Sequence, residues 1–243
     1  MMALLSSNGM GAFFYEIIMI SDNDELYNII KVLSDTREEE ILKQTQELYA
    51  SIADTQAEWY KKSGFTCPDG CGECCRNFEP DLLDCEALFM AAWIIENQSE
   101  VADKILEGDF PFPENKGCPF WDENKEYHCT IYGGRPFICR FFGACGSKDK
   151  DGKTVFKPCK FYPANILASH KPPLAHRQYS EKETLEIFGR LPIAMTDIME
   201  TAVSLNPNNQ TTEELRSILP KYIKHLRWIC NIKKAAPEDS LNS

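Results

Sequence analysis

The chain has 243 residues, of which 43% are hydrophobic, so it can bury a sizeable core and disorder is not the expectation for it as a whole. Its net charge of −11 argues against a general nucleic-acid-binding role. No stretch approaches the roughly 18 uninterrupted apolar residues of a membrane span. We therefore expect neither a nucleic-acid partner nor a membrane partner.

Residues 1–35 are predicted to be a leader, partly disordered, ahead of a single domain over 36–234 and a tail over 235–243. The N-terminus lacks the basic start of a signal peptide, and Glu16 interrupts its apolar run. We therefore expect a cytoplasmic protein with reduced thiols, in which clustered cysteines more often bind metal than form disulfides. The alternative for residues 1–20 is a start codon assigned too early.

Helices are predicted on both sides of a cysteine-rich segment. The first begins at the capping pair Thr36 and Glu39 and ends at Gly64. The second is apolar along its whole length, which is typical of a buried helix. The predicted helices span residues 36–63, 81–97 with a continuation or restart over 100–107, 180–190, 193–205 and 211–234.

Between Gly117 and Pro163 the pattern changes to short elements. Two brief strands are expected around the turn at 122–125, a short helix is expected to begin at Pro136, and a hairpin is expected through Asp151 and Gly152. The predicted fold is therefore mainly α, with helices before and after a small, irregular α+β core at about 64–163 that is rich in cysteine. A bound metal would contribute folding energy to such a segment.

Cysteine spacing carries the strongest functional signal. Ten of the eleven cysteines lie between Cys67 and Cys159, and "CPDGCGECC" places four of them in nine residues. Two or three residues between cysteines allow a tight turn to aim both sulfurs at one ion or cluster. Further cysteines follow at positions that a hairpin could return to the same site. The close-spaced group is Cys67, Cys71, Cys74 and Cys75, and the later cysteines are Cys118, Cys129, Cys139, Cys145 and Cys159.

The number of thiols leaves the number of centres open. Eight candidates suffice for two sites of four ligands, or for one cluster with several structural cysteines. In an extended backbone the neighbours Cys74 and Cys75 would point to opposite sides, so we expect one to face the first site and the other a second site or the core. Cys85, Cys145 and Cys230 are not assigned; Cys85 and Cys230 can be explained as buried apolar residues.

These residues resemble a known family. "CPDGCGECC", "CPFW" and "CTIYGGRPFICRFF" are similar, in this order, to the CxxCxxCC cysteine-cluster proteins, described as zinc- or iron-chelating and often as iron–sulfur proteins. Flagellin lysine N-methylases carry a related domain. The resemblance covers roughly residues 64–163. It implies eight candidate ligands, Cys67, Cys71, Cys74, Cys75, Cys118, Cys129, Cys139 and Cys159, of which Cys159 has the weakest local match. This chain departs from the family pattern with three residues, not two, between Cys67 and Cys71.

Two arginines beside these cysteines are candidate cofactor-binding residues. Arg135 and Arg140 could donate hydrogen bonds to cluster sulfurs or offset their negative charge. Residues 116–160 carry a net charge of +4, which leaves −15 for the remainder of the chain. Pro136 fixes the backbone ahead of Cys139 and so the direction of its sulfur. The alternative is that both arginines pair with surface carboxylates.

The metal is expected to be an iron–sulfur cluster, with zinc as the alternative. Both accept four thiolates, and both are compatible with a region whose one histidine, His128, is expected to point away from the ligands. The resemblance to a family with iron–sulfur members favours the cluster.

Three functions compete. Cys-x3-Cys-x2-Cys is the spacing of radical S-adenosylmethionine enzymes, but Glu73 replaces the usual aromatic residue and no strand–helix alternation follows. An S-adenosylmethionine-dependent modification enzyme similar to flagellin lysine N-methylase would need a donor pocket for which no glycine-rich loop is visible. The preferred hypothesis is a non-catalytic metalloprotein acting in electron transfer, metal handling or association with a protein partner.

Overall fold

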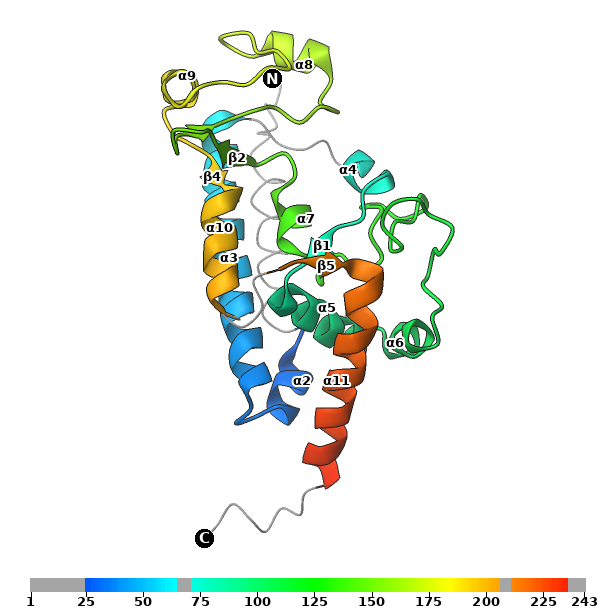
Figure 1. Cartoon of the computed structure of the whole chain (residues 1–243). Coiled ribbons are helices and arrows are strands. Elements are labelled where there is room, and N and C mark those ends of the chain that lie inside the picture. Colours follow the sequence, from blue (N-terminus) through cyan, green and yellow to red (C-terminus); the bar gives the residue numbers. More distant parts are fainter. Residues whose placement is uncertain (1–24, 65–70, 206–210, 236–243) are drawn as a thin grey trace, which may run out of the picture.

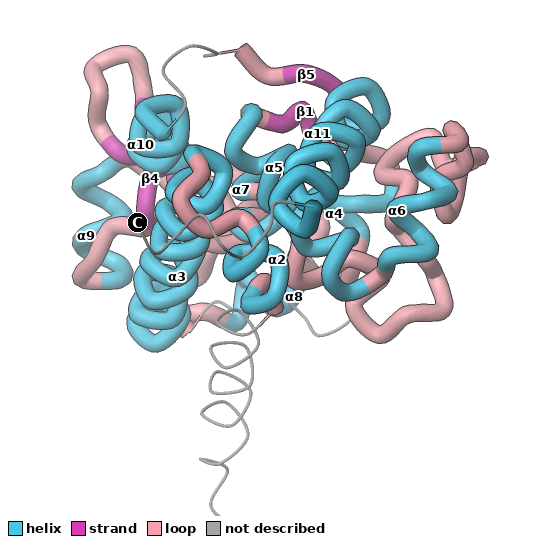
Figure 2. Tube along the Cα trace, turned by 90° about the horizontal axis from the view of Figure 1, so that it is seen from below, coloured by secondary structure: helices cyan, strands magenta, loops and turns pink. Residues whose placement is uncertain are grey.

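A central helix is enclosed by two long ones. The structure, a computed structural model, describes residues 25–64, 71–205 and 211–235 (Figure 1). Helix α5 (Asp84–Asn97) packs against α11 (Leu215–Ala235) on one side and α3 (Arg37–Ser63) on the other, as the end-on view in Figure 2 shows. The fold is mainly α with small sheets, which confirms the predicted fold class.

Helix α5 is buried because its sequence is apolar on every face. All residues from Cys85 to Ile94 are buried, including the single carboxylate Glu86. A helix that is hydrophobic all round can be satisfied only by packing partners on several sides, which α3 and α11 provide. It begins at Asp84, later than the 81–97 pattern suggests, because Asp81 and Leu82 pair as strand β1 with β5 (Glu213–Glu214).

Local signals set the ends of α3. The Thr36 hydroxyl accepts a hydrogen bond from the Glu39 amide at 3.2 Å, and Gly64 adopts a left-handed φ of 64° at the C-terminus. Ahead of it, α2 (Tyr27–Val32) places Ile29 in the main core. Residues 1–24, most of the expected leader, and 236–243, most of the expected tail, lie outside the described residues.

The remaining helices are short or peripheral. A capping box formed by Ser180 and Glu183 begins α9, within the predicted helix 180–190. These helices are α4 (Glu73–Arg76), α6 (Ser99–Leu106), α7 (Phe137–Phe141), α8 (Ala164–Ser169), α9 (Glu181–Phe188) and α10 (Met195–Leu205).

Two predicted β elements had different outcomes. The hairpin through Gly152 is present, with β2 (Cys145–Lys148) antiparallel to β3 (Thr154–Val155) and parallel to β4 (Ile193–Ala194). The strand pair expected around 122–125 is reduced to a single bridge between Trp121 and Cys129. Backbone hydrogen bonds in this loop instead close tight turns, such as that from the His128 amide to the Lys125 carbonyl at 3.0 Å.

Side chains gather in two buried clusters. The larger surrounds α5 and includes α3, α11 and the loop that contains Ile131. The smaller lies at the end of α3, where Trp59 meets Phe156 and Phe188 edge-on at centroid distances of 5.1 and 5.0 Å. Among the described helices, none combines the length and the apolar character needed to cross a bilayer.

Candidate metal centre

The single turn α4 presents two neighbouring thiols together. Its N-cap, Gly72, has a φ of 53°, and a Cβ at this position would collide with the His128 ring. Because the segment is helical rather than extended, the Sγ atoms of Cys74 and Cys75 lie 3.7 Å apart. The extended backbone assumed for this pair is therefore wrong.

A close backbone contact brings Cys118 to α4. A Cβ on Gly117 would lie 2.6 Å from the Phe78 amide nitrogen and 2.8 Å from the Arg76 carbonyl oxygen, so only glycine allows this approach. The next residue, Cys118, therefore enters the same region as Cys75. The Arg216 guanidinium secures the loop from the other side by donating to the Asn115 and Gly117 carbonyls at 3.0 and 3.2 Å.

Helix α7 supplies a third segment. Pro136 occupies its N-cap position, as the sequence predicts for a short helix here, and Phe137 is fully buried. The Phe137 ring packs edge-on against the Tyr49 ring of α3, with centroids 4.8 Å apart. Cys139 is thus held one half-turn beyond a residue anchored in the main core.

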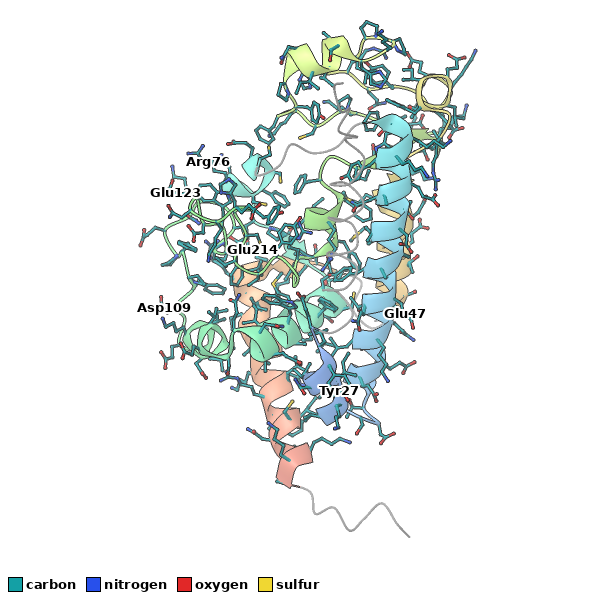
Figure 3. The ribbon with its side chains drawn as sticks, turned by 180° about the vertical axis from the view of Figure 1, so that it is seen from behind. Tyr27, Glu47, Arg76, Asp109, Glu123 and Glu214 are labelled. Atoms are coloured by element: carbon teal, nitrogen blue, oxygen red, sulfur yellow. The ribbon has the colours of Figure 1, made fainter. Side chains whose placement is uncertain are left out.

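Four thiols from separate parts of the chain line one cavity of about 20 Å³: Cys75 of α4, Cys118, Cys129 and Cys139 of α7. In Figure 3, Arg76 of α4 and Glu123 lie on the side of the molecule away from α3. Apart from the thiols, Arg135 and His128, the wall is mainly apolar: Pro80, Met90, Phe120, Trp121, Ile131, Pro136 and Leu215.

Burial disfavours the thiolate form of Cys118, Cys129 and Cys139. Burial raises the pKa of Cys118 to about 12, and burial together with the neighbouring thiols of Cys118 and Cys129 raises the pKa of Cys139 well above its usual value. Burial also raises the pKa of Cys129. Since a metal binds the thiolate, loading this site must release protons.

Arg135 is the cation of the cavity. Its positive charge lowers the pKa of Cys129 and Cys139 against the larger effect of burial. Its guanidinium carbon lies 3.3 Å from the centroid of the Tyr132 ring, and among the described residues its buried Nε has no hydrogen-bond partner. A buried N–H donor without an acceptor is costly, so an acceptor belongs beside it.

Trp121 adds a second such donor, which the sequence reasoning missed. Its ring lines the cavity, and its Nε1 is buried with no partner among the described residues. The available signal was its position three residues after Cys118, in "CPFW". Two unpartnered N–H donors beside four sulfurs match the hydrogen bonds that cluster sulfurs accept.

Arg140 has a different position from Arg135. Its Nε donates to the Arg135 carbonyl at 2.9 Å, and its Nη2 donates to the Gly133 carbonyl. The guanidinium carbon lies 3.8 Å from the centroid of the Tyr49 ring. Arg140 therefore braces the loop that carries Arg135, while its charge also lowers the pKa of Cys129.

The other candidate ligands lie around this group. Cys74 lies close enough to Cys129, Cys139 and Cys159 for its charge to raise the pKa of each of these thiols. The charge of Cys71 likewise raises the pKa of Cys159, so these two thiols also lie near each other. Cys67 lies outside the described residues. The structure thus describes four inner thiols on the cavity and a second group, Cys71, Cys74 and Cys159, that does not line it.

The three described cysteines that are not candidate ligands also lie off the cavity. Cys85 is buried on α5, where its thiol contacts the Ala202 carbonyl at 3.7 Å. Cys145 lies in β2, and Cys230 lies on α11.

We expect Cys230→Ala to leave the bound metal unchanged, because this thiol is remote from the inner group along α11. Metal analysis of the purified variant beside the wild-type protein provides the check. A metal content reduced by a half or more would place α11 in the coordination shell.

Spacing between the ligands constrains the kind of centre. Within residues 25–64, 71–205 and 211–235, no three Cys, His, Asp or Glu side chains converge closely enough to hold a single ion. The four inner thiols nevertheless surround one cavity. These four residues therefore line a common cavity but do not converge on a single ion position.

Residues 66–165 match the sequence model of a family described as "CxxCxxCC: Putative zinc- or iron-chelating domain". The match covers about two fifths of the chain and includes every candidate ligand, while all of α3, α9, α10 and α11 lies outside it. Neither the curated proteins nor the solved structures contain a match to the chain. The family match supports metal binding and agrees with the resemblance seen in the cysteine motifs.

Proposed function

We propose that this chain, whose residues 66–165 form a CxxCxxCC domain, is a non-catalytic iron–sulfur protein that transfers electrons. The observation that carries the proposal is the convergence of Cys75, Cys118, Cys129 and Cys139 on one cavity. The family description supports metal binding but does not distinguish zinc from iron.

The donor set fits a sulfur-ligated centre. Four thiols are the ligands that both structural zinc and iron–sulfur clusters require. His128, the one histidine on the cavity wall, has its Nδ1 within 3.1 Å of the Asp122 carbonyl, so this nitrogen is engaged with the backbone. The apolar wall excludes water, which favours retention of a cluster.

The arrangement of the described ligands is compatible with a cluster. A tetrahedral zinc site needs four sulfurs at about 2.3 Å from one point, and among the described residues, which do not include Cys67, no three potential ligands form such a group. A polynuclear cluster interposes its own atoms and accepts thiols that lie farther apart. The cavity of about 20 Å³ is close to the space for one water molecule, so loading either centre requires the wall to adjust.

Charge in the wall also suits a thiolate centre. A metal held by four thiolates carries a net negative charge, and Arg135 brings a buried positive charge to it. The unpartnered N–H groups of Arg135 and Trp121 would donate to cluster or thiolate sulfurs. Hydrogen bonds to sulfur are among the factors that set the reduction potential of such a cluster.

The position of the centre supports electron transfer. A bound iron–sulfur cluster supplies one-electron redox chemistry. No residue of α4, the turn that covers one side of the cavity, is buried, so only a thin layer separates the inner thiols from solvent at that side. A redox partner could therefore approach closely.

The test is elemental analysis of protein purified without oxygen. We expect iron and acid-labile sulfide in similar amounts, with a brown colour that bleaches on reduction. Stoichiometric zinc in a colourless protein would show that the centre is a structural zinc site and not an iron–sulfur cluster. Protein that folds fully without either metal would overturn the proposal.

Binding of S-adenosylmethionine separates the carrier from the enzyme hypothesis. We expect none by the anaerobically purified protein, since the sheets in the described part of the chain have only two and three short strands. Saturable binding at micromolar concentration would overturn the non-catalytic assignment. This chain would then be an enzyme that contains the cluster.

Arg135→Gln is expected to weaken retention of the metal about ten-fold, because the change removes the buried charge beside the thiolates. The measurement is the rate at which a chelator withdraws iron from the loaded protein.

Arg177→Gln is the matched control for this change. The Arg177 guanidinium also stacks on a tyrosine, at 3.8 Å from the Tyr179 ring centroid, but it pairs with Glu183 on the surface. If Arg177→Gln accelerated iron loss as much as Arg135→Gln does, the effect of Arg135 would come from lost stacking and not from its charge beside the thiols.

A further inference from the structure

Glu86 is a buried carboxylate in an apolar helix. It lies on α5, is 2% exposed, and is the only charged residue among the buried ones in the described part of the chain. A carboxylate in such surroundings is expensive unless hydrogen bonds satisfy it. Its retention on α5 therefore calls for an explanation in terms of what it binds.

The two oxygens of Glu86 join two helix N-termini. Oε2 accepts a hydrogen bond from the Leu83 amide at 2.9 Å, at the start of α5 itself. Oε1 accepts one from the Phe137 amide at 2.7 Å, which is the first residue of α7. Both amides belong to the unpaired N–H groups that every helix start leaves over.

This connection reaches the candidate centre through α7. Cys139 lies two residues beyond Phe137 on the same single-turn helix. Arg140, the next residue, holds the carbonyls of Gly133 and Arg135. The anchor at Phe137 thus positions one cavity thiol directly and the cavity arginine through Arg140.

We infer that Glu86 is the positioning residue of the metal centre: its carboxylate fixes α7 on α5 and thereby sets the places of the Cys139 thiol and the Arg135 guanidinium. This inference rests on the proposed metal centre. Glu86 does not line the cavity, so it acts through the backbone of α7 and not as a ligand.

The test replaces one acceptor oxygen. In Glu86→Gln the side chain has a single carbonyl oxygen and an NH₂ group, so it cannot accept from both amides. We expect the anaerobically purified variant to release iron to a chelator about ten-fold faster than the wild type, with altered circular dichroism in the visible bands of the cluster. Glu86→Asp retains two acceptor oxygens and should release iron more slowly than Glu86→Gln.

Thr184→Val is the control for a general loss of packing. Thr184 is fully buried on α9, where its hydroxyl donates to the Ser180 carbonyl at 2.8 Å. This variant loses a buried hydrogen bond at a helix that packs against β3, and we expect its iron release and visible spectrum to match the wild type. Equal acceleration in both variants would reduce Glu86 to a structural residue and overturn the inference.

The remaining outcomes separate the two proposals. Iron in the wild type with identical release from Glu86→Gln overturns the positioning role but leaves the cluster. A wild type that carries zinc overturns the cluster, and zinc release from the same variants then tests Glu86 in the same way. If Glu86→Gln does not fold, Glu86→Asp decides, because its side chain is one methylene shorter and draws both oxygens back from the Phe137 amide. Iron release faster than in the wild type supports the inference, and release at the wild-type rate with an unchanged spectrum overturns it.

Discussion

Replacing Cys139 with alanine is expected to remove most of the bound iron. Cys139 lines the cavity with three other cysteines. Its helix is anchored at Phe137, which fixes the position of the sulfur. Loss of one of four ligands opens the coordination shell and weakens retention of the metal. Iron and sulfide analysis of the anaerobically purified variant measures the effect, and Cys118→Ala should behave alike.

Cys145→Ala is the matched control within the same domain. Cys145 lies in β2, is partly buried, and does not line the cavity. We expect wild-type iron content in this variant. Full iron content in Cys139→Ala and Cys118→Ala, both normally folded, would show that the inner thiols do not hold the centre.

Glu86 is expected to make the protein less stable as the pH rises. Burial raises the pKa of this carboxyl from its ordinary 4.5 to about 7, although hydrogen bonds from Leu83 and Phe137 and the charge of Arg140 act in the opposite direction. Between these two values the folded state keeps a proton that the unfolded state has lost. Stability therefore falls as pH rises through this window and levels off above the folded-state pKa.

The size of this effect is about 3 kcal/mol between about pH 4.5 and about pH 7.5. Glu86→Gln cannot titrate, so the difference in free energy of unfolding between wild type and this variant isolates the contribution of Glu86. Chemical unfolding at a series of pH values gives that difference. A difference that stays constant across the window would mean that the carboxyl titrates normally in the fold.

Together these results would separate stability from positioning. The ionised carboxylate costs folding energy near neutral pH, yet its two oxygens hold α7 in place. A variant that becomes relatively more stable at higher pH while releasing its metal faster would show that the residue is kept for the centre. Functional sites commonly retain such costs.

Local signals in the sequence were sufficient for the helices that frame the site. The cap at Thr36 and the stop at Gly64 bound α3 as predicted, and Pro136 begins α7. The all-apolar character of α5 indicated its central place. Each of these features depends on residues within a few positions of one another, where backbone conformation and side-chain type decide the outcome.

The presence of metal-ligating cysteines was likewise evident from spacing, and the family match over 66–165 supports metal binding. The sequence could not divide the thiols into groups. Cys75, Cys118, Cys129 and Cys139 are joined by contacts across long separations, such as that of Gly117 with the backbone of Arg76 and Phe78. The helical turn of α4, which places Cys74 beside Cys75, also contradicts the extended backbone assumed for them.

The sequence by itself therefore determined a mainly helical chain with a sulfur-rich core, because composition, periodicity and close spacing are local properties. Only the tertiary structure decided which thiols share a cavity, that Arg135 faces them while Arg140 braces the loop, and that Glu86 joins α5 to α7. These facts depend on which distant segments pack together. Packing of this kind follows from the whole core and not from any one motif.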